Sequence, residues 1–393
     1  MNFDLNEEQT LLKDSIERYL SNQYDFDHRR EVAHSESGTD AKDWQNFAEL
    51  GWLSIPFAED AGGFGGGAVD TMVIMEQLGR GLVLEPYLET VLLFGKLLEA
   101  TADSESPAIE YLEAVISGEL TGALAYQERQ SRYELADVNT RARKEGDNWL
   151  LSGEKTVVFN GAIADKFVVS ARVSGGPGDR DGLGLFLVDG AAEGLKRTTF
   201  RMMDGRLVAN IGLDDVVAEQ MLASGEAGYA VLAAAIQNAT LAVCAEAVGI
   251  MDRLREDTLE YAKTREQFGV YIGSFQALQH RLVDMFSACE QARSLLYRTV
   301  CSMDEGRDDV AANVHALKAM IGKAGKAVGA EAIQIHGGMG MTDELPVGHY
   351  VKRLLMINTL FGDRDYHLQR FVELSKPIET ASLTAIVVDE HAA

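Results

Sequence analysis

The first part of the chain repeats apolar positions at helical spacing. In residues 6–20, NEEQTLLKDSIERYL, apolar side chains recur three and four positions apart, and acidic side chains fill the first turn. This pattern predicts an α-helical domain over residues 1–118. The stretch IPFAEDAGGFGGGAVD interrupts it with a proline and five glycines. A helical segment rather than a strand precedes these glycines, so we interpret the loop as a turn that lines a cleft, not as a phosphate-binding loop.

The pattern changes over residues 119–221. The segments KFVVSARV and GLGLFLVDG are rich in Val, Phe and Leu, and glycine and aspartate separate them. Short apolar runs bounded by turn residues are typical of a β-barrel or sandwich. We therefore predict a central β-domain.

Helical periodicity returns over residues 222–375 and predicts a C-terminal four-helix bundle. In SFQALQHRLVDMFSAC one helical face carries six apolar residues, namely Phe275, Leu278, Leu282, Met285, Phe286 and Cys289. The tail, residues 376–393, shows no clear pattern, and its IVVDE segment could be a strand or frayed. The predicted fold class is α+β multidomain, in the order helices, central β-barrel-like domain, helical bundle.

The composition is that of an acidic globular protein. The 393 residues carry a net charge of −25, which argues against binding to nucleic acid or to an anionic membrane. An anionic ligand would need a locally basic or backbone-lined pocket. The most apolar stretch, YAVLAAAIQNATLAVCAEAVGI, contains Gln237, Asn238 and Glu246, and this polarity favours a buried helix over a membrane span.

Three cysteines, Cys244, Cys289 and Cys301, show neither CxxC spacing nor an even framework. Such cysteines are typical of small buried side chains in a reducing compartment. The N-terminus shows no basic segment followed by an apolar one, so we expect a cytoplasmic protein.

Two motifs in the C-terminal half carry a resemblance. Residues 261–276 read YAKTREQFGVYIGSFQ, and residues 334–340 read QIHGGMG. Together with GWLSIP and GGFGG near the N-terminus, they make the chain resemble the acyl-CoA dehydrogenase family. The resemblance implies an FAD cofactor, an acyl-CoA substrate and the helix, β-domain, bundle order described above. In the family a base removes the proton alpha to the thioester, and a hydride passes to the flavin.

The resemblance also implies cofactor-binding residues. The family glycines approach the dinucleotide part of an FAD held by a neighbouring subunit, where a Cβ would obstruct. An arginine fork suits the pyrophosphate, a phenyl ring the adenine, and a glutamine a nearby hydrogen bond. The implied residues here are Arg265, Phe268, Gln276, Gln334, Gly337 and Gly338. His336 lies within the second motif but has no partners at metal-ligand spacing, so we interpret it as structural and predict no metal site.

The chain departs from the family at the catalytic base. Most members carry a glutamate where this chain has Phe361, in NTLFGDRDYH. A minority place it on the helix before the first motif, where this chain has Ala239 followed by Thr240. No carboxylate occupies either position, so we assign no catalytic residue. The β-domain also lacks the family residues that hold the flavin ring, and KTVVFNG offers Val157 and Phe159 instead.

Three hypotheses remain open. The first is a base-lacking, FAD-contacting subunit of an α2β2 acyl-CoA dehydrogenase, similar to the small subunits of pimeloyl-CoA and steroid side-chain enzymes. The second is a homomeric enzyme with an unusual base, for which Asp363 is the first candidate, with Glu344 and Asp365 nearby. The third is a structural protein without flavin chemistry. The resemblance implies electron-transfer flavoprotein as the electron acceptor and points weakly to dicarboxylic or ring-bearing acyl groups.

Overall fold

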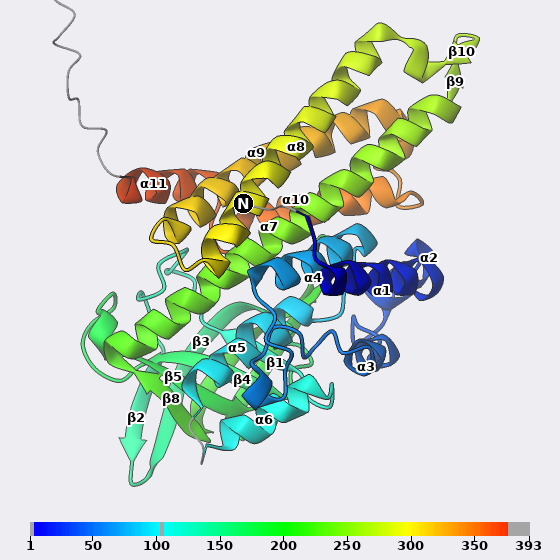
Figure 1. Ribbon diagram of the computed structural model, residues 1–393. Helices are drawn as coiled ribbons and strands as arrows, with labels where there is room; N and C mark the ends of the chain where they lie inside the picture. Colours follow the sequence, from blue (N-terminus) through cyan, green and yellow to red (C-terminus); the bar gives the residue numbers. More distant parts are fainter. Residues whose placement is uncertain (1–3, 103–105, 376–393) are drawn as a thin grey trace, which may run out of the picture.

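A computed structural model describes residues 4–102 and 106–375 of the protein. The N-terminal part consists of helices, drawn blue to cyan in Figure 1. They are α1 (Glu7–Gln23), α2 (Phe26–His34), α3 (Ala41–Glu49), the short η1 (Glu59–Ala61), α4 (Ala68–Gly81), the π-helical η2 (Tyr87–Gly95), α5 (Lys96–Thr101) and α6 (Pro107–Ile116). Asn6, the N-cap residue of α1, forms a capping box with Gln9, as the polar residues before the apolar repeat favour.

The central part is one mainly antiparallel sheet. Its strands are β1 (Gly122–Ala125), β2 (Arg141–Glu145), β3 (Asn148–Phe159), β4 (Lys166–Arg172), β5 (Leu183–Asp189), β6 (Leu195–Arg201), β7 (Leu207–Ala218) and β8 (Gln220–Ser224), with the short η3 (Arg180–Gly182) before β5. They lie in the order β6-β7-β3-β2-β4-β5-β8, and β1 pairs in parallel with β4. The register of β3 on β7 shifts twice, once between Lys155 and Val158. This second shift bends β3 beside the candidate site.

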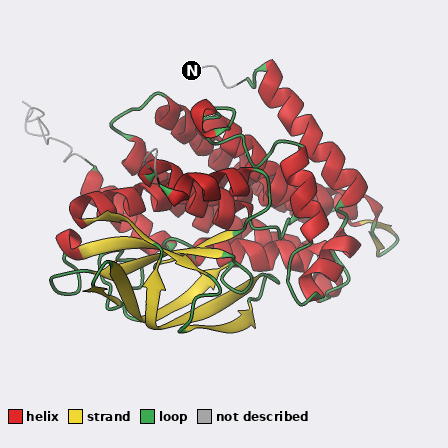
Figure 2. Ribbon diagram, turned by 90° about the horizontal axis from the view of Figure 1, so that it is seen from below, coloured by secondary structure: helices red, strands yellow, loops and turns green. Residues whose placement is uncertain are grey.

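Both faces of the sheet are covered at β4 and β5, which is why the middle of each strand is an apolar run. Phe167 and Val169 point into a core internal to the β-domain, whereas Val168 packs against the helices. Alternate residues of a strand point to opposite faces, so a continuous apolar run is needed. Figure 2 shows the sheet on one side of the helical mass.

The C-terminal part is built on long helices. These are α7 (Gly225–Thr264), α8 (Gln276–Asp304), α9 (Val310–His336), α10 (Pro346–Thr359) and α11 (Arg364–Leu374). The hairpin of β9 (Glu266–Gln267) and β10 (Val270–Tyr271), followed by η4 (Ile272–Ser274), joins α7 to α8, and η5 (Gly337–Met341) follows α9. In Figure 1 the hairpin projects at the far end of the bundle.

α7 passes through the centre of the molecule. Among the described residues it alone is long and apolar enough to cross a membrane, but 67% of its most apolar window is buried within the protein. This burial is that of a core helix, and it agrees with the interpretation of the 229–250 stretch.

The predicted fold class is confirmed, and two details differ from the prediction. The predicted limit at 118/119 falls between α6 and β1. The predicted limit at 221/222 falls inside β8, since α7 begins only at Gly225. On α8, Met285 and Cys289 are buried as predicted, but Phe286 is 49% exposed, and Phe275, the residue before the helix, is 38% exposed. The tail, including IVVDE, lies outside the described residues.

Candidate functional site

The turn between α10 and α11 carries the family base position. Phe361 is buried and adopts a positive φ of 59°, which few non-glycine residues do. Two buried side chains hold this turn. Lys318 Nζ on α9 donates to the Gly362 carbonyl at 2.7 Å, and His367 Nε2 donates to the Phe361 carbonyl at 3.2 Å. The backbone is therefore fixed with a phenyl ring at the position where the resemblance places the catalytic carboxylate.

Burial lowers the pKa of both side chains, that of Lys318 to about 8 and that of His367 to about 3. Near pH 7 this leaves His367 neutral, whereas Lys318 still carries its proton. His367 Nδ1 faces His315 Nδ1 at 2.7 Å, and burial lowers the pKa of His315 to about 4. Since His367 Nε2 donates to a carbonyl, its Nδ1 must accept, and His315 donates.

Phe361 lines a cleft that side chains have almost filled. The cleft lies between η2, β1, the bent part of β3 and the 360–361 turn, and its volume is about 20 Å³. Such a volume holds roughly one water molecule. Val157, with a positive φ of 52°, and Phe159 line the β3 side. The residues present therefore do not fit a flavin ring at this place.

One carboxylate in the cleft was not predicted from the sequence. Glu89, on η2, lines the cleft and is 3% exposed. Burial raises its pKa, and Arg206, whose Nη1 lies 4.0 Å from Glu89 Oε1, only partly offsets this. Its Oε2 has no hydrogen-bond partner among the described residues. The signal in the sequence was a single acidic residue inside the apolar run YLETVLLFG.

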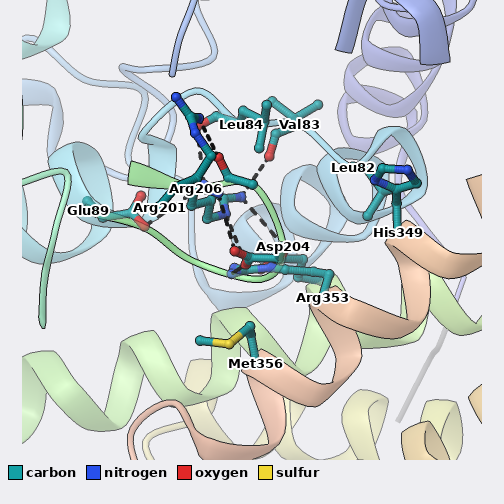
Figure 3. A network of polar contacts seen from close by, with 12 residues as sticks. Leu82, Val83, Leu84, Glu89, Arg201, Asp204, Arg206, His349, Arg353 and Met356 are labelled. Atoms are coloured by element: carbon teal, nitrogen blue, oxygen red, sulfur yellow. Dashed lines mark hydrogen bonds and ion pairs between the residues drawn. The ribbon is translucent and has the colours of Figure 1, made fainter. Parts of the chain in front are cut away.

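Glu89 stands at the edge of a buried ionic network that joins the three parts of the chain (Figure 3). Arg353 on α10 donates to both carboxylate oxygens of Glu246 on α7, at 2.6 and 2.8 Å. It also donates to Asp204, in the β6–β7 turn, at 2.9 Å. Burial alone would raise the pKa of Asp204, but Arg353 and Arg206 together lower it. The network holds α7, α10 and the β-domain together behind the cleft.

The alternative base candidates do not line the cleft. Asp363 begins α11, and its Oδ1 accepts from the Tyr366 backbone N–H at 2.9 Å, a helix-capping role. Its Oδ2 accepts from Tyr133 at 3.4 Å. Glu344 and Asp365 are exposed.

The position where a minority of the family carries the base also lacks an acidic side chain here. Ala239 is fully buried, and the Thr240 hydroxyl donates to the Ile236 carbonyl at 2.6 Å within α7.

The candidate cofactor residues gather at the opposite end of the bundle. They belong to the C-terminus of α7, the β9–β10 hairpin, the N-terminus of α8 and the C-terminus of α9. Tyr261 stacks on His336 with ring centroids 4.3 Å apart, which ties the end of α7 to the end of α9. His336 is buried, and its Nδ1 donates to the Ala332 carbonyl at 2.9 Å, as its structural interpretation requires.

We call this surface the dinucleotide face, comprising Arg265, Phe268, Gln276, Gln334, Gly337 and Gly338. All six residues are exposed, and Phe268, at φ 56°, is 93% exposed. Glu260 pairs with Lys263, and no ion pair engages the Arg265 guanidinium within the described part of the chain. Gly337 has φ 60° and ψ −137°, and a Cβ on it or on Gly338 would meet nothing within 4 Å. The glycines thus leave an open surface beside an unpaired cation, which fits an anionic dinucleotide.

Comparison with known proteins places the chain in a family. Domain models of the acyl-CoA dehydrogenase family match it in order, the N-terminal domain over residues 6–119, the middle domain over 123–216 and the C-terminal domain over 226–373. A variant of the Tcur3481-Tcur3483 steroid ACAD is similar at 30% identity and TM-score 0.83, covering 93% of this chain and 97% of that one.

Two further solved structures are similar over 95% of this chain and 98% of theirs. PigA with FAD and proline has 27% identity and TM-score 0.87. The ChsE4-ChsE5 complex from Mycobacterium tuberculosis has 26% identity and TM-score 0.85. The chain therefore belongs to the acyl-CoA dehydrogenase family of oxidoreductases, which use FAD to dehydrogenate acyl-CoA.

Proposed function

We propose that this chain is the base-lacking, FAD-contacting subunit of a heteromeric acyl-CoA dehydrogenase. The observation that carries the proposal is a contrast within one chain. The dinucleotide face is exposed and unobstructed, whereas the cleft beside Phe361 is reduced to about 20 Å³. A partner chain of the same family would supply the base and the flavin-ring site.

In this arrangement the exposed residues of the dinucleotide face can contact the FAD. Arg265 pairs with the pyrophosphate, Gln334 hydrogen-bonds to the dinucleotide, and Gly337 brings bare backbone against it. When bound, FAD accepts the hydride of the dehydrogenation. The chain's own part is to bind and orient the cofactor.

Exposed apolar side chains around this face support a partner of the same family. Phe268, Phe275 and Met341 are 93%, 38% and 75% exposed, although apolar residues of this size are usually buried. The similar ChsE4-ChsE5 structure is that of a complex. We extend the proposal to acyl-CoA as substrate and to electron-transfer flavoprotein as acceptor.

Co-expression tests the proposal. The chain is purified alone and together with a candidate partner chain of the same family, and the flavin absorbance is recorded before and after acyl-CoA is added. We expect a colourless chain alone, and a yellow complex that acyl-CoA bleaches.

Variants sharpen this experiment. Arg265→Ala should lower the FAD content of the complex, whereas Arg370→Ala, on exposed α11, should not. A chain that is yellow and bleached on its own would overturn the proposal.

A further inference from the structure

A second cavity lies on the other side of η2 from the filled cleft. Its volume is about 180 Å³, and it opens between α4, η2, α5 and α7 beside the glycine-rich loop. The two cavities share no lining residue: Leu92 faces this one and Leu93 faces the cleft. On α7 its wall is formed by Asn238, Leu241, Ala242 and Ala245.

The glycine-rich loop explains the shape of the cavity but does not bind phosphate. A Cβ on Gly67 would lie 2.7 Å from Asp304 Oδ1 at the end of α8. Asp304 accepts hydrogen bonds from the backbone N–H groups of Ala68 and Val69, at 2.6 and 3.1 Å. The first turn of α4 is therefore already occupied by a carboxylate, and an anionic ligand finds no donors there.

The floor of the cavity is apolar. Met72, Leu241 and Ala242 are nearly or fully buried and line it. An apolar cavity of about 150 Å³ in another protein stays dry and binds benzene. This cavity is open to solvent at Asn238, which is exposed, so a bound apolar group would displace water from the apolar floor.

Three polar side chains, Thr71, Lys96 and Asn238, also line the cavity. Lys96 Nζ donates to the Pro56 carbonyl at 2.9 Å and pairs with Glu99, so its charge is already balanced. Within the described part of the chain, the side chains of Thr71 and Asn238 make no hydrogen bond. A ligand's polar group that hydrogen-bonds to Thr71 or Asn238 is thus expected to be uncharged.

We propose that this cavity binds a small uncharged molecule with an apolar body about the size of one ring and a single hydroxyl or carbonyl group. The apolar body rests against Met72 and Ala242, and the polar group hydrogen-bonds to Thr71 and Asn238. The site is separate from the cleft and from the dinucleotide face.

Phenol and benzene serve as probes, with binding measured by calorimetry and ligand-observed NMR on the full-length chain. We expect saturable phenol binding that Ala242→Leu, which fills the cavity, weakens at least tenfold. Ala234→Leu, at an exposed position of the same helix, should leave it unchanged. Thr71→Val should weaken phenol several-fold and leave benzene unaffected.

Absence of saturable phenol binding in the wild-type chain overturns the proposal, as does wild-type affinity in a folded Ala242→Leu variant. If Ala242→Leu does not fold, Thr71→Val decides alone. An equal effect of Thr71→Val on phenol and benzene, or none on either, would reject the assigned polar contact.

Discussion

Lys318 Nζ donates a 2.7 Å hydrogen bond to the carbonyl oxygen of Gly362, across from α9 to the turn that carries Phe361. Lys318 is 1% exposed, and its Nζ donates to two backbone carbonyls, of Gly362 and Asn358. A buried amine is costly unless its hydrogens are bonded, so this lysine and this turn stabilise each other.

Removing this contact should weaken the fold. Lys318→Met leaves the Gly362 carbonyl unpaired, and we expect a loss of about 1–3 kcal/mol in the free energy of unfolding. Denaturant unfolding measures it, and Lys323→Met, at an exposed position of the same helix, is the control. Equal stability of the two variants would show that the turn does not depend on Lys318.

His367 should make the stability depend on pH. Its pKa is about 3 in the folded chain against an ordinary value of 6.5. Between these values the unfolded chain binds a proton that the folded chain does not, so stability falls as the pH is lowered. At pH 5 the different protonation of His367 in the two states lowers the free energy of unfolding by about 2 kcal/mol.

Comparison of unfolding at pH 7 and pH 5 checks this expectation. His367→Gln should reduce the loss on acidification, whereas His34→Gln, an exposed histidine, should not. A loss that is the same in wild type and His367→Gln would contradict the assignment.

Restoring the family carboxylate should not restore activity. Phe361→Glu places a carboxyl group in a buried cleft of about 20 Å³, so we expect lower stability and no turnover of acyl-CoA by the chain alone. Phe361→Leu separates loss of the ring from gain of the carboxyl group. Turnover by homomeric Phe361→Glu would mean that the cleft still accepts a flavin ring.

Substitutions at the two neighbouring glycines should distinguish an effect on backbone strain from an effect on cofactor binding. Gly337→Ala forces a side chain into φ 60° and ψ −137°, and we expect a loss of about 1–3 kcal/mol in the isolated chain. Gly338 has open space around it and no positive φ, so Gly338→Ala should leave stability nearly unchanged. In the complex both variants should lower FAD affinity. An unaltered FAD affinity in Gly338→Ala would remove it from the dinucleotide face.

The buried arginine should be the most sensitive position. Arg353→Met leaves Glu246 and Asp204 without their shared partner, which costs roughly 3–5 kcal/mol when a buried pair loses one member. Thermal and denaturant unfolding measure this, and Lys352→Met on the exposed side of α10 is the control. A small effect would mean that water or Arg206 takes over the carboxylates.

Local patterns predicted the elements, and short motifs predicted the dinucleotide face. Arg265 and Gly337 could be proposed as cofactor contacts because their spacing is local and their chemistry demands one residue type. The roles of Glu89 and Lys318 could not be predicted, because each acts through partners far away in the chain. A single charged residue in an apolar run does not indicate which residue it contacts. The second cavity was equally hidden, since small residues such as Ala242 look like ordinary helix packing.

Counting the FAD in the purified complex tests the central claim most directly. Flavin released by denaturation is measured by absorbance and compared with the protein concentration of each chain. The account predicts one FAD for each pair of unlike chains, because this chain lends its dinucleotide face and holds no flavin ring. Two FAD molecules per pair would contradict it.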